Sequence, residues 1–242
     1  MPSILEALVP PDSAAATSQE YLDVGLGARP HTTLEWAASL RRNDPGARVL
    51  GLDRDPDVVA AAGPAAVPGL RFAVANWTWP GLGARAARAL NVLRDYTADE
   101  APLAHLRMAE ALADGGVLVE GSCGPHGEVG AVHVLRRDGL QLVDEGLLFW
   151  TDGSQGSAPI LFRDRLPVAV RRAVQLDHPL GRLMEAWMAA HAAVRGRGVG
   201  ALAALAASVD HLGDPELTCR GEGAVWWRRP CGLRHRGFIG AG

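Results

Sequence analysis

Short apolar runs alternate with longer amphipathic stretches through the first half of the chain. The runs have the length and composition of buried strands, and they lie at residues 21–24, 48–52, 70–75, 86–92 and 117–120. Helical patterns lie between them, among them residues 56–62 and 98–112. Parallel strands need a long crossover between them, and helices of this length supply it. The pattern therefore predicts an α/β fold with a doubly wound, mostly parallel sheet, Rossmann-like in type.

The expected helix boundaries follow from capping residues. Thr32 or Thr33 can cap the helix that follows the first strand, and Pro56 can begin the next one. The run Ala-Asp-Gly-Gly at 113–116 is expected to end the helix over 98–112.

The second half of the chain has a different pattern. Residues 131–136 and 141–150 flank Asp138-Gly139, which predicts a hairpin. Added C-terminal helices are expected near 165–174, 180–195 and 198–212, followed by a late antiparallel strand at 224–227.

These elements predict one domain with short extensions. We expect an N-terminal arm or frayed helix at 1–18, a single domain at 19–230 and a flexible tail at 231–242. Within the domain, 19–123 is the expected cofactor-binding half and 124–230 the substrate-side half.

Composition narrows the function classes. The chain has 242 residues, 48% hydrophobic and 21% charged, as in an ordinary globular protein. A net charge of -3 argues against a long nucleic acid as the partner. There is no basic start followed by an apolar run, and no apolar stretch of membrane-spanning length, so we expect a cytoplasmic protein without a membrane partner. The 3 cysteines form no CxxC pair and the 8 histidines are scattered, so no metal site is predicted.

A glycine-rich turn follows the first strand. In Leu-Asp-Val-Gly-Leu-Gly-Ala-Arg-Pro at 22–30, Gly25 and Gly27 allow a ligand to approach the backbone. Asp53 ends the second strand, where a carboxylate can accept hydrogen bonds from a ribose. The dinucleotide fingerprint expects a small residue where Pro30 stands, and Asp23 suits a cationic amino group better than a pyrophosphate. The pattern thus predicts a nucleoside-bearing ligand.

The pattern Asp-x-Gly-x-Gly-x-x-Pro resembles motif I of the class I S-adenosylmethionine-dependent methyltransferases. The resemblance covers roughly residues 20–123: residues 51–55 look like the second motif, 72–77 like the third, and 112–119 like a late strand entry. It implies S-adenosylmethionine as cofactor, with the residues expected to bind it being Asp23, Gly25, Gly27, Asp53, Arg54, Asn76, Trp77 and Asn91.

The resemblance also implies individual roles. Asp53 would meet the ribose, Arg54 would lie alongside the adenine and Asn76 would meet the adenine amine. Trp77 is equally compatible with a core indole.

The segment at the end of the fourth predicted strand supplies the candidate catalytic side chains, Asn91 and Tyr96. Tyr96 could cover the cofactor, orient a substrate or simply pack, and Arg94 could pair with Asp95. No catalytic base is predicted, because methyl transfer needs one only if the acceptor loses a proton. A separate alternative makes Cys123 a nucleophile assisted by His126.

The predicted function is methyl transfer from S-adenosylmethionine to a small-molecule or protein acceptor. Two alternatives stay open: a non-catalytic S-adenosylmethionine-binding sensor or scaffold, and an NAD-type oxidoreductase.

Overall fold

Strands and helices alternate through the first half of the structure, except between the third and fourth strands, where the described residues form no helix. The computed structural model describes residues 12–77, 79–171, 178–195 and 198–229. The strands of this half are β1 (Glu20–Val24), β2 (Arg48–Asp53), β3 (Leu70–Val74), β4 (Ala84–Leu90) and β5 (Leu112–Cys123). Its helices are α2 (Ala14–Thr17), α3 (His31–Asn43), α4 (Pro56–Ala62), the 3₁₀ turn η1 (Gly63–Ala65) and α5 (Ala101–Ala109).

The second half adds antiparallel strands and a group of helices. The strands are β6 (Val129–Asp138), β7 (Gln141–Thr151), β8 (Leu217–Cys219) and β9 (Ala224–Trp227). The helices are α6 (Ile160–Arg163), α7 (Val168–Arg171), α8 (Pro179–Arg195) and α9 (Ala201–Leu212). None of the helices in the described ranges combines the length and the apolar character needed to cross a bilayer.

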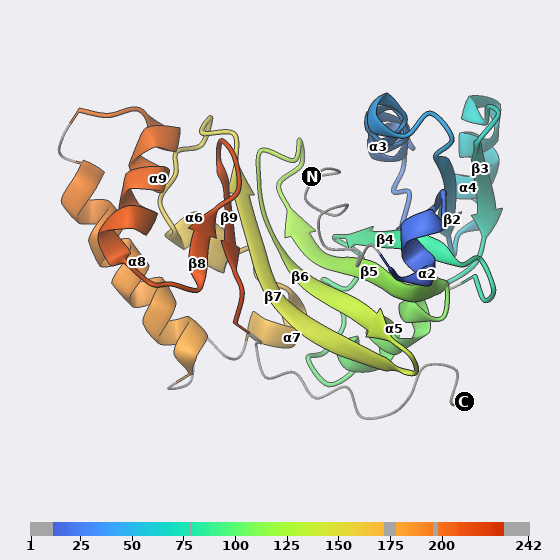
Figure 1. Ribbon diagram of the computed structural model, residues 1–242. Helices are drawn as coiled ribbons and strands as arrows, with labels where there is room; N and C mark the ends of the chain where they lie inside the picture. Colours follow the sequence, from blue (N-terminus) through green and yellow to red (C-terminus); the bar gives the residue numbers. More distant parts are fainter. Residues whose placement is uncertain (1–11, 78, 172–177, 196–197, 230–242) are drawn as a thin grey trace.

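The strands of the described residues join into one nine-stranded sheet in the order β3-β2-β1-β4-β5-β6-β7-β9-β8. Pairing is parallel from β3 to β5 and antiparallel from β5 to β8. The chain leaves β1 toward β2 and β3 on one side, then crosses to β4 on the other, so the parallel part is doubly wound as predicted. Figure 1 shows α3 and α4 at one end of this sheet and α8 and α9 at the other.

Helices cover both faces of the parallel part. Successive residues of a strand point to opposite faces. Tyr21 of β1 packs in one buried cluster with Trp36 of α3, and its neighbour Leu22 packs in a second cluster with Leu106 of α5. The two helices therefore lie on opposite faces, which is the layered arrangement expected of this fold class.

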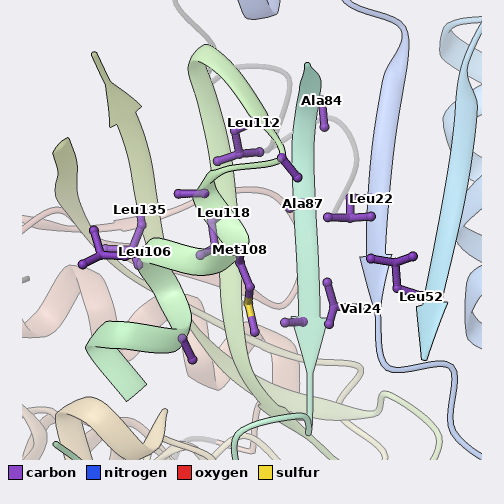
Figure 2. Packing of buried hydrophobic residues seen from close by; sticks show 14 of the residues in the cluster. Leu22, Val24, Leu52, Ala84, Ala87, Leu106, Met108, Leu112, Leu118 and Leu135 are labelled. Atoms are coloured by element: carbon purple, nitrogen blue, oxygen red, sulfur yellow. The ribbon is translucent and has the colours of Figure 1, made fainter. Parts of the chain in front are cut away.

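Leucines and alanines fill the layer beneath α5. Figure 2 shows Leu106 and Met108 of this helix beside Leu118 of β5, with Ala87 and Leu22 on the next strands of the sheet. The five side chains are at most 5% exposed. Alanines on β4 leave room for the longer side chains of the helix, because a core interdigitates large and small residues at nearly crystalline density.

Aromatic side chains hold the C-terminal helices on β7. Trp187 of α8 is fully buried, stacks on Phe162 with ring centroids 5.5 Å apart and meets Phe149 edge-on at 5.6 Å. Its indole N–H donates to the Ser208 hydroxyl of α9 at 2.9 Å, so the buried polar atom is satisfied.

Several predicted elements have the same bounds in the structure, and others do not. Strand β9 and helix α4 begin and end where the pattern places them. The hairpin forms, but Asp138 pairs with Gln141, and the turn residues are Gly139 and Leu140. Gly139 has a φ of 58°, the conformation that a two-residue hairpin turn demands at this position.

The predicted helix ends were wrong at two places. Neither Thr32 nor Thr33 caps α3, since the residue before the helix is Pro30 and the Thr33 hydroxyl donates to Asp23 instead. The run 113–116 lies inside β5 rather than at the end of α5, because α5 ends at Ala109 and Leu112 already pairs with Ala84 of β4. Gly115 has a φ of 79° where the pairing of β4 with β5 is irregular.

Smaller corrections concern element length. Strand β4 begins two residues before the predicted 86–92, α5 starts at Ala101 rather than residue 98, and α9 starts at Ala201 rather than residue 198. Of the helix predicted at 165–174, the structure shows α7, and residues 172–177 lie outside the described ranges. The antiparallel part comprises β6 to β9, so it has one strand, β8, in addition to the predicted hairpin and late strand.

The predicted extensions lie partly in the described ranges. Within the predicted arm, α2 packs on the domain with Ala15 fully buried, and the Ser18 hydroxyl donates to the Gly83 carbonyl at 2.6 Å. Residues 1–11 and the predicted tail at 231–242 lie outside the described residues.

Candidate functional site

The candidate site lies where the winding of the sheet changes direction. Strands β1 and β4 are neighbours and parallel, yet the connections that leave them run to opposite sides of the sheet. Such a reversal leaves a crevice at the carboxyl ends of the two strands, and ligands of open α/β sheets bind there. Gly25 follows β1 and Asn91 follows β4, so both residues stand at this crevice.

The turn after β1 requires glycine. Gly25 and Gly27 have φ values of 84° and 65°, in the left-handed region that side chains disfavour. A Cβ on Gly25 would lie 2.7 Å from the Val92 side chain, whereas a Cβ on Gly27 would meet nothing within 4 Å. The Gly25 N–H donates to the Leu52 carbonyl of β2 at 2.8 Å and fixes the turn against the next strand.

Asp53 ties this turn to the end of β2. One carboxylate oxygen accepts the Leu26 N–H and the other accepts the Asp55 N–H, each at 3.0 Å. A carboxylate oxygen has two lone pairs, so each can accept one more hydrogen bond. The half-buried carboxylate lines a cavity and can bind two neighbouring hydroxyl groups.

The cavity has a volume of about 520 Å³. That volume is in the ordinary range for small-molecule and cofactor sites. The sequence-predicted residues that line it are Gly25, Gly27, Asp53, Arg54, Asn76, Trp77, Asn91 and Tyr96. The structure thus brings every predicted site residue except Asp23 to this cavity, from the ends of β1, β2, β3 and β4.

Two aromatic side chains form an apolar part of its wall. Trp77 and Tyr96 meet edge-on with ring centroids 5.5 Å apart, and both pack against the core beneath α5. Tyr96 therefore packs and lines the cavity at the same time. No ion pair joins Arg94 to Asp95 within the described chain, contrary to the prediction, and Asp95 lines the cavity instead.

Asn91 joins the ends of β4 and β5. Its φ is 63°, a left-handed conformation that asparagine tolerates better than most residues. Its side-chain oxygen accepts the Cys123 N–H at 3.1 Å, its amide donates to the Cys123 sulfur at 3.4 Å, and its own N–H donates to the Gly121 carbonyl at 2.7 Å. These bonds hold the residue rigidly at the crevice.

Asp23 has a different partner from the one predicted. Its buried carboxylate accepts two hydrogen bonds from the Arg88 guanidinium, at 2.8 and 2.6 Å, and one from Thr33 at 2.6 Å. The prediction placed a ligand's amino group at this carboxylate; in the structure an arginine of β4 already neutralises it. Asp23 and Asp53 nevertheless lie on adjacent parallel strands, at the same edge of the sheet.

A second cavity of about 630 Å³ adjoins the first, and Gly25, Leu90 and Asn91 line both. Asp23, Arg88 and Cys123 line only the second. Burial raises the pKa of the Cys123 thiol, and the Asn91 amide and the Arg88 charge offset this only in part. The raised pKa keeps the thiol protonated at neutral pH, which opposes the alternative in which Cys123 is a nucleophile.

Glu100, which also lines the first cavity, was missed from the sequence. Its carboxylate accepts the N–H and the hydroxyl of Thr97, both at 2.8 Å, just before α5. The pattern Thr-x-x-Glu at 97–100 is a capping-box signature and could have identified the residue. No sequence pattern could have identified Arg88, because its contact with Asp23 depends on the pairing of β1 with β4.

Comparison with known proteins finds likeness in structure alone. No family model matches the chain, and no curated protein does. Among solved structures, LepI in complex with S-adenosylmethionine is 24% identical with a TM-score of 0.38, over 50% of this chain and 31% of that chain. Human N-acetylserotonin methyltransferase, also in complex with S-adenosylmethionine, is 17% identical with a TM-score of 0.37, over 50% of this chain and 33% of that chain.

A third similar structure is an S-adenosylmethionine-dependent methyltransferase from Mesorhizobium loti, 23% identical with a TM-score of 0.37, over 51% of this chain and 53% of that chain. The chain thus spans between about a third and about half of the length of these three proteins.

Proposed function

We propose that the chain is an S-adenosylmethionine-dependent methyltransferase with its cofactor in the first cavity. One observation carries the proposal: at the crevice between β1 and β4, the open turn at Gly25 and Gly27 stands beside the Asp53 carboxylate, whose oxygens each have a free lone pair. A carboxylate in this position suits the two hydroxyl groups of a ribose.

The residues around the cavity fit the remaining parts of the ligand. Trp77 and Tyr96 offer apolar ring surfaces for an adenine, and Asn76 offers an amide that can donate and accept hydrogen bonds. Gly27 leaves space in which the ligand can approach the backbone. The residues present therefore fit a nucleoside with a flexible substituent.

When bound, S-adenosylmethionine supplies an electrophilic methyl group: a lone pair of the acceptor forms the new bond to carbon, and the electrons of the broken carbon–sulfur bond remain on sulfur in S-adenosylhomocysteine. The chain's own part is alignment. Asn91, locked between β4 and β5, stands between the two cavities and can orient the reacting groups. A small molecule or a protein side chain is the acceptor we propose, and the net charge of -3 opposes a long nucleic acid.

Parallel calorimetric titrations with S-adenosylmethionine, S-adenosylhomocysteine and NAD test the proposal. We expect both sulfur nucleosides to bind in the micromolar range, and Asp53→Asn to weaken them about ten- to hundredfold, as losing hydrogen bonds to a charged group does. Asp57→Asn, an exposed carboxylate of α4, is the matched control and should bind normally.

Binding of NAD alone would refute the proposal in favour of an oxidoreductase. Tight binding of S-adenosylmethionine, without transfer of its labelled methyl group to any component of a metabolite extract, would point to a sensor instead.

A further inference from the structure

The second cavity is placed to hold the methyl acceptor, if the first holds the cofactor as proposed above. The two cavities meet at Gly25, Leu90 and Asn91, so molecules in them would touch at the carboxyl ends of β1 and β4. Its volume of about 630 Å³ suits a small molecule.

Indole rings on two separate elements form walls of this cavity. Trp36 comes from α3 and Trp150 from the end of β7. The Trp150 N–H donates to the Gly127 carbonyl at 2.9 Å, which fixes the indole over the loop between β5 and β6. Gly130 leaves room for this ring, because a Cβ there would fall within 2.2 Å of it. Two fixed indoles favour a flat, aromatic occupant.

The carboxylates and the guanidinium that line the cavity, Asp23, Glu35 and Arg88, leave a negative excess. Asp23 and Arg88 neutralise each other in a bidentate pair. Glu35, on the exposed side of α3, lines the same cavity and forms no salt bridge within the described chain. Glu128, whose carboxylate accepts the His126 N–H at 2.9 Å, and Arg165 act on Cys123 with opposite signs, so they do not change this balance. A cationic group of a ligand near Glu35 would therefore be attracted, and an anionic group would be repelled.

We propose that the acceptor is a small aromatic molecule with a basic amine, and that Glu35 selects it by holding the ammonium group. A second, uncharged oxygen or nitrogen of the same molecule then faces the first cavity and takes the methyl group. Any proton that this atom loses passes to solvent through the imidazoles that line the second cavity, His31 and His126. The proposal rests on the proposed function and adds to it the class of substrate.

Three phenols of similar size test the proposal: tyramine, which is cationic, 4-ethylphenol, which is neutral, and 4-hydroxyphenylacetate, which is anionic. Each is titrated calorimetrically into the full chain saturated with S-adenosylhomocysteine. We expect tyramine to bind at least about tenfold more tightly than 4-ethylphenol, and the anion to bind weakest. Glu35→Gln should abolish the preference, while Glu185→Gln, an exposed glutamate of α8, should keep it.

Equal binding of the three phenols, binding of none of them, or a preference that survives Glu35→Gln would each overturn the inference. S-adenosylhomocysteine should bind wild type and Glu35→Gln alike, which separates this test from that of the proposed function. Failure of S-adenosylhomocysteine to bind the wild type would refute the proposed function itself, and the phenols would then be titrated into the unliganded chain.

Discussion

Gly25 shows how one residue couples the turn after β1 to the candidate site. Its φ of 84° is disfavoured for any side chain, and the space above its Cα is occupied by Val92. The residue therefore satisfies a backbone requirement and a packing requirement at once, and both act on the turn that lines the first cavity.

Gly25→Ala is expected to lower the free energy of unfolding by about 1–3 kcal/mol, the usual cost of a strained backbone. Binding of S-adenosylhomocysteine should weaken in parallel, because the turn must shift to relieve the contact with Val92. Gly63→Ala is the matched control: Gly63 has helical dihedrals and open space around its Cα, so it should tolerate a side chain. Urea unfolding and calorimetry measure the two effects; normal binding by Gly25→Ala would contradict our placement of the cavity.

The buried salt bridge between Asp23 and Arg88 is a second feature at the scale of single residues. Both side chains are at most 9% exposed, and the guanidinium also lies 4.5 Å from the Trp36 ring centre. Removing one member of a buried pair leaves an uncompensated charge, and this costs about 3–5 kcal/mol.

Arg88→Met alone should therefore destabilise the protein strongly, whereas Asp23→Asn combined with Arg88→Met should recover much of the loss. A double-mutant cycle by urea unfolding measures the coupling. Additive effects of the two substitutions would show that the charges do not interact as the geometry indicates.

At the scale of elements, Glu100 caps the start of α5 together with Thr97 and also lines the first cavity. The bonds from the Thr97 N–H and hydroxyl favour the ionised carboxylate and hold the pKa of Glu100 below its ordinary value of 4.5. Ionised Glu100 thus contributes stability at pH values above 4.5, and this contribution is lost as the pH falls through the lower pKa of the folded state.

We expect wild type to melt at a higher temperature than Glu100→Gln at neutral pH, with the difference shrinking as the pH is lowered below 4.5. Melting curves between neutral and acidic pH check this. Glu185→Gln, far from any cap, should show no comparable trend, and a difference that grew toward acidic pH would contradict the assigned direction.

At the scale of the whole molecule, one sheet joins the parallel half to the antiparallel half. Residues 117–121 of β5 pair with β4 on one side and with β6 on the other, so the two halves share a backbone ladder. Such continuity predicts a single cooperative unfolding transition.

Trp187→Ala tests this cooperativity. Loss of a fully buried indole that packs on Phe149 and Phe162 should cost about 3–5 kcal/mol. We expect the entire urea transition to move, with circular dichroism and tryptophan fluorescence still coinciding. Leu103→Ala, at a side chain that is 56% exposed, should change little. A separate early transition in Trp187→Ala would show that the C-terminal helices unfold independently.

Much of the parallel half was predictable because its signals are local. A buried strand followed by glycine, an aspartate at a strand end and a proline at a helix start each reflect dihedral or solvation preferences of neighbouring residues. Strand β2, helix α4 and the turn at Gly25 therefore lie where the pattern predicts them. The parallel direction of these strands also follows, because long crossovers between successive strands favour a parallel sheet.

Other features depended on contacts between distant residues. Thr33 has the right chemistry to cap a helix, but α3 begins at His31, so Thr33 lies inside its first turn, and its hydroxyl donates to the buried carboxylate of Asp23. Residues 113–116 resemble a helix end, yet they lie inside β5 because Leu112 before them and Val117 after them both pair with β4.

The sequence by itself determined the strand-and-helix alternation, the glycine turn and the carboxylate at the end of β2, because backbone dihedrals and burial act within a few residues. Only the tertiary structure decided that Arg88 neutralises Asp23, that Asn91 bridges β4 and β5, and that Glu35 lines a second cavity beside the first. These features depend on which elements become neighbours, because a charged or polar side chain meets its partner only when the sheet has formed.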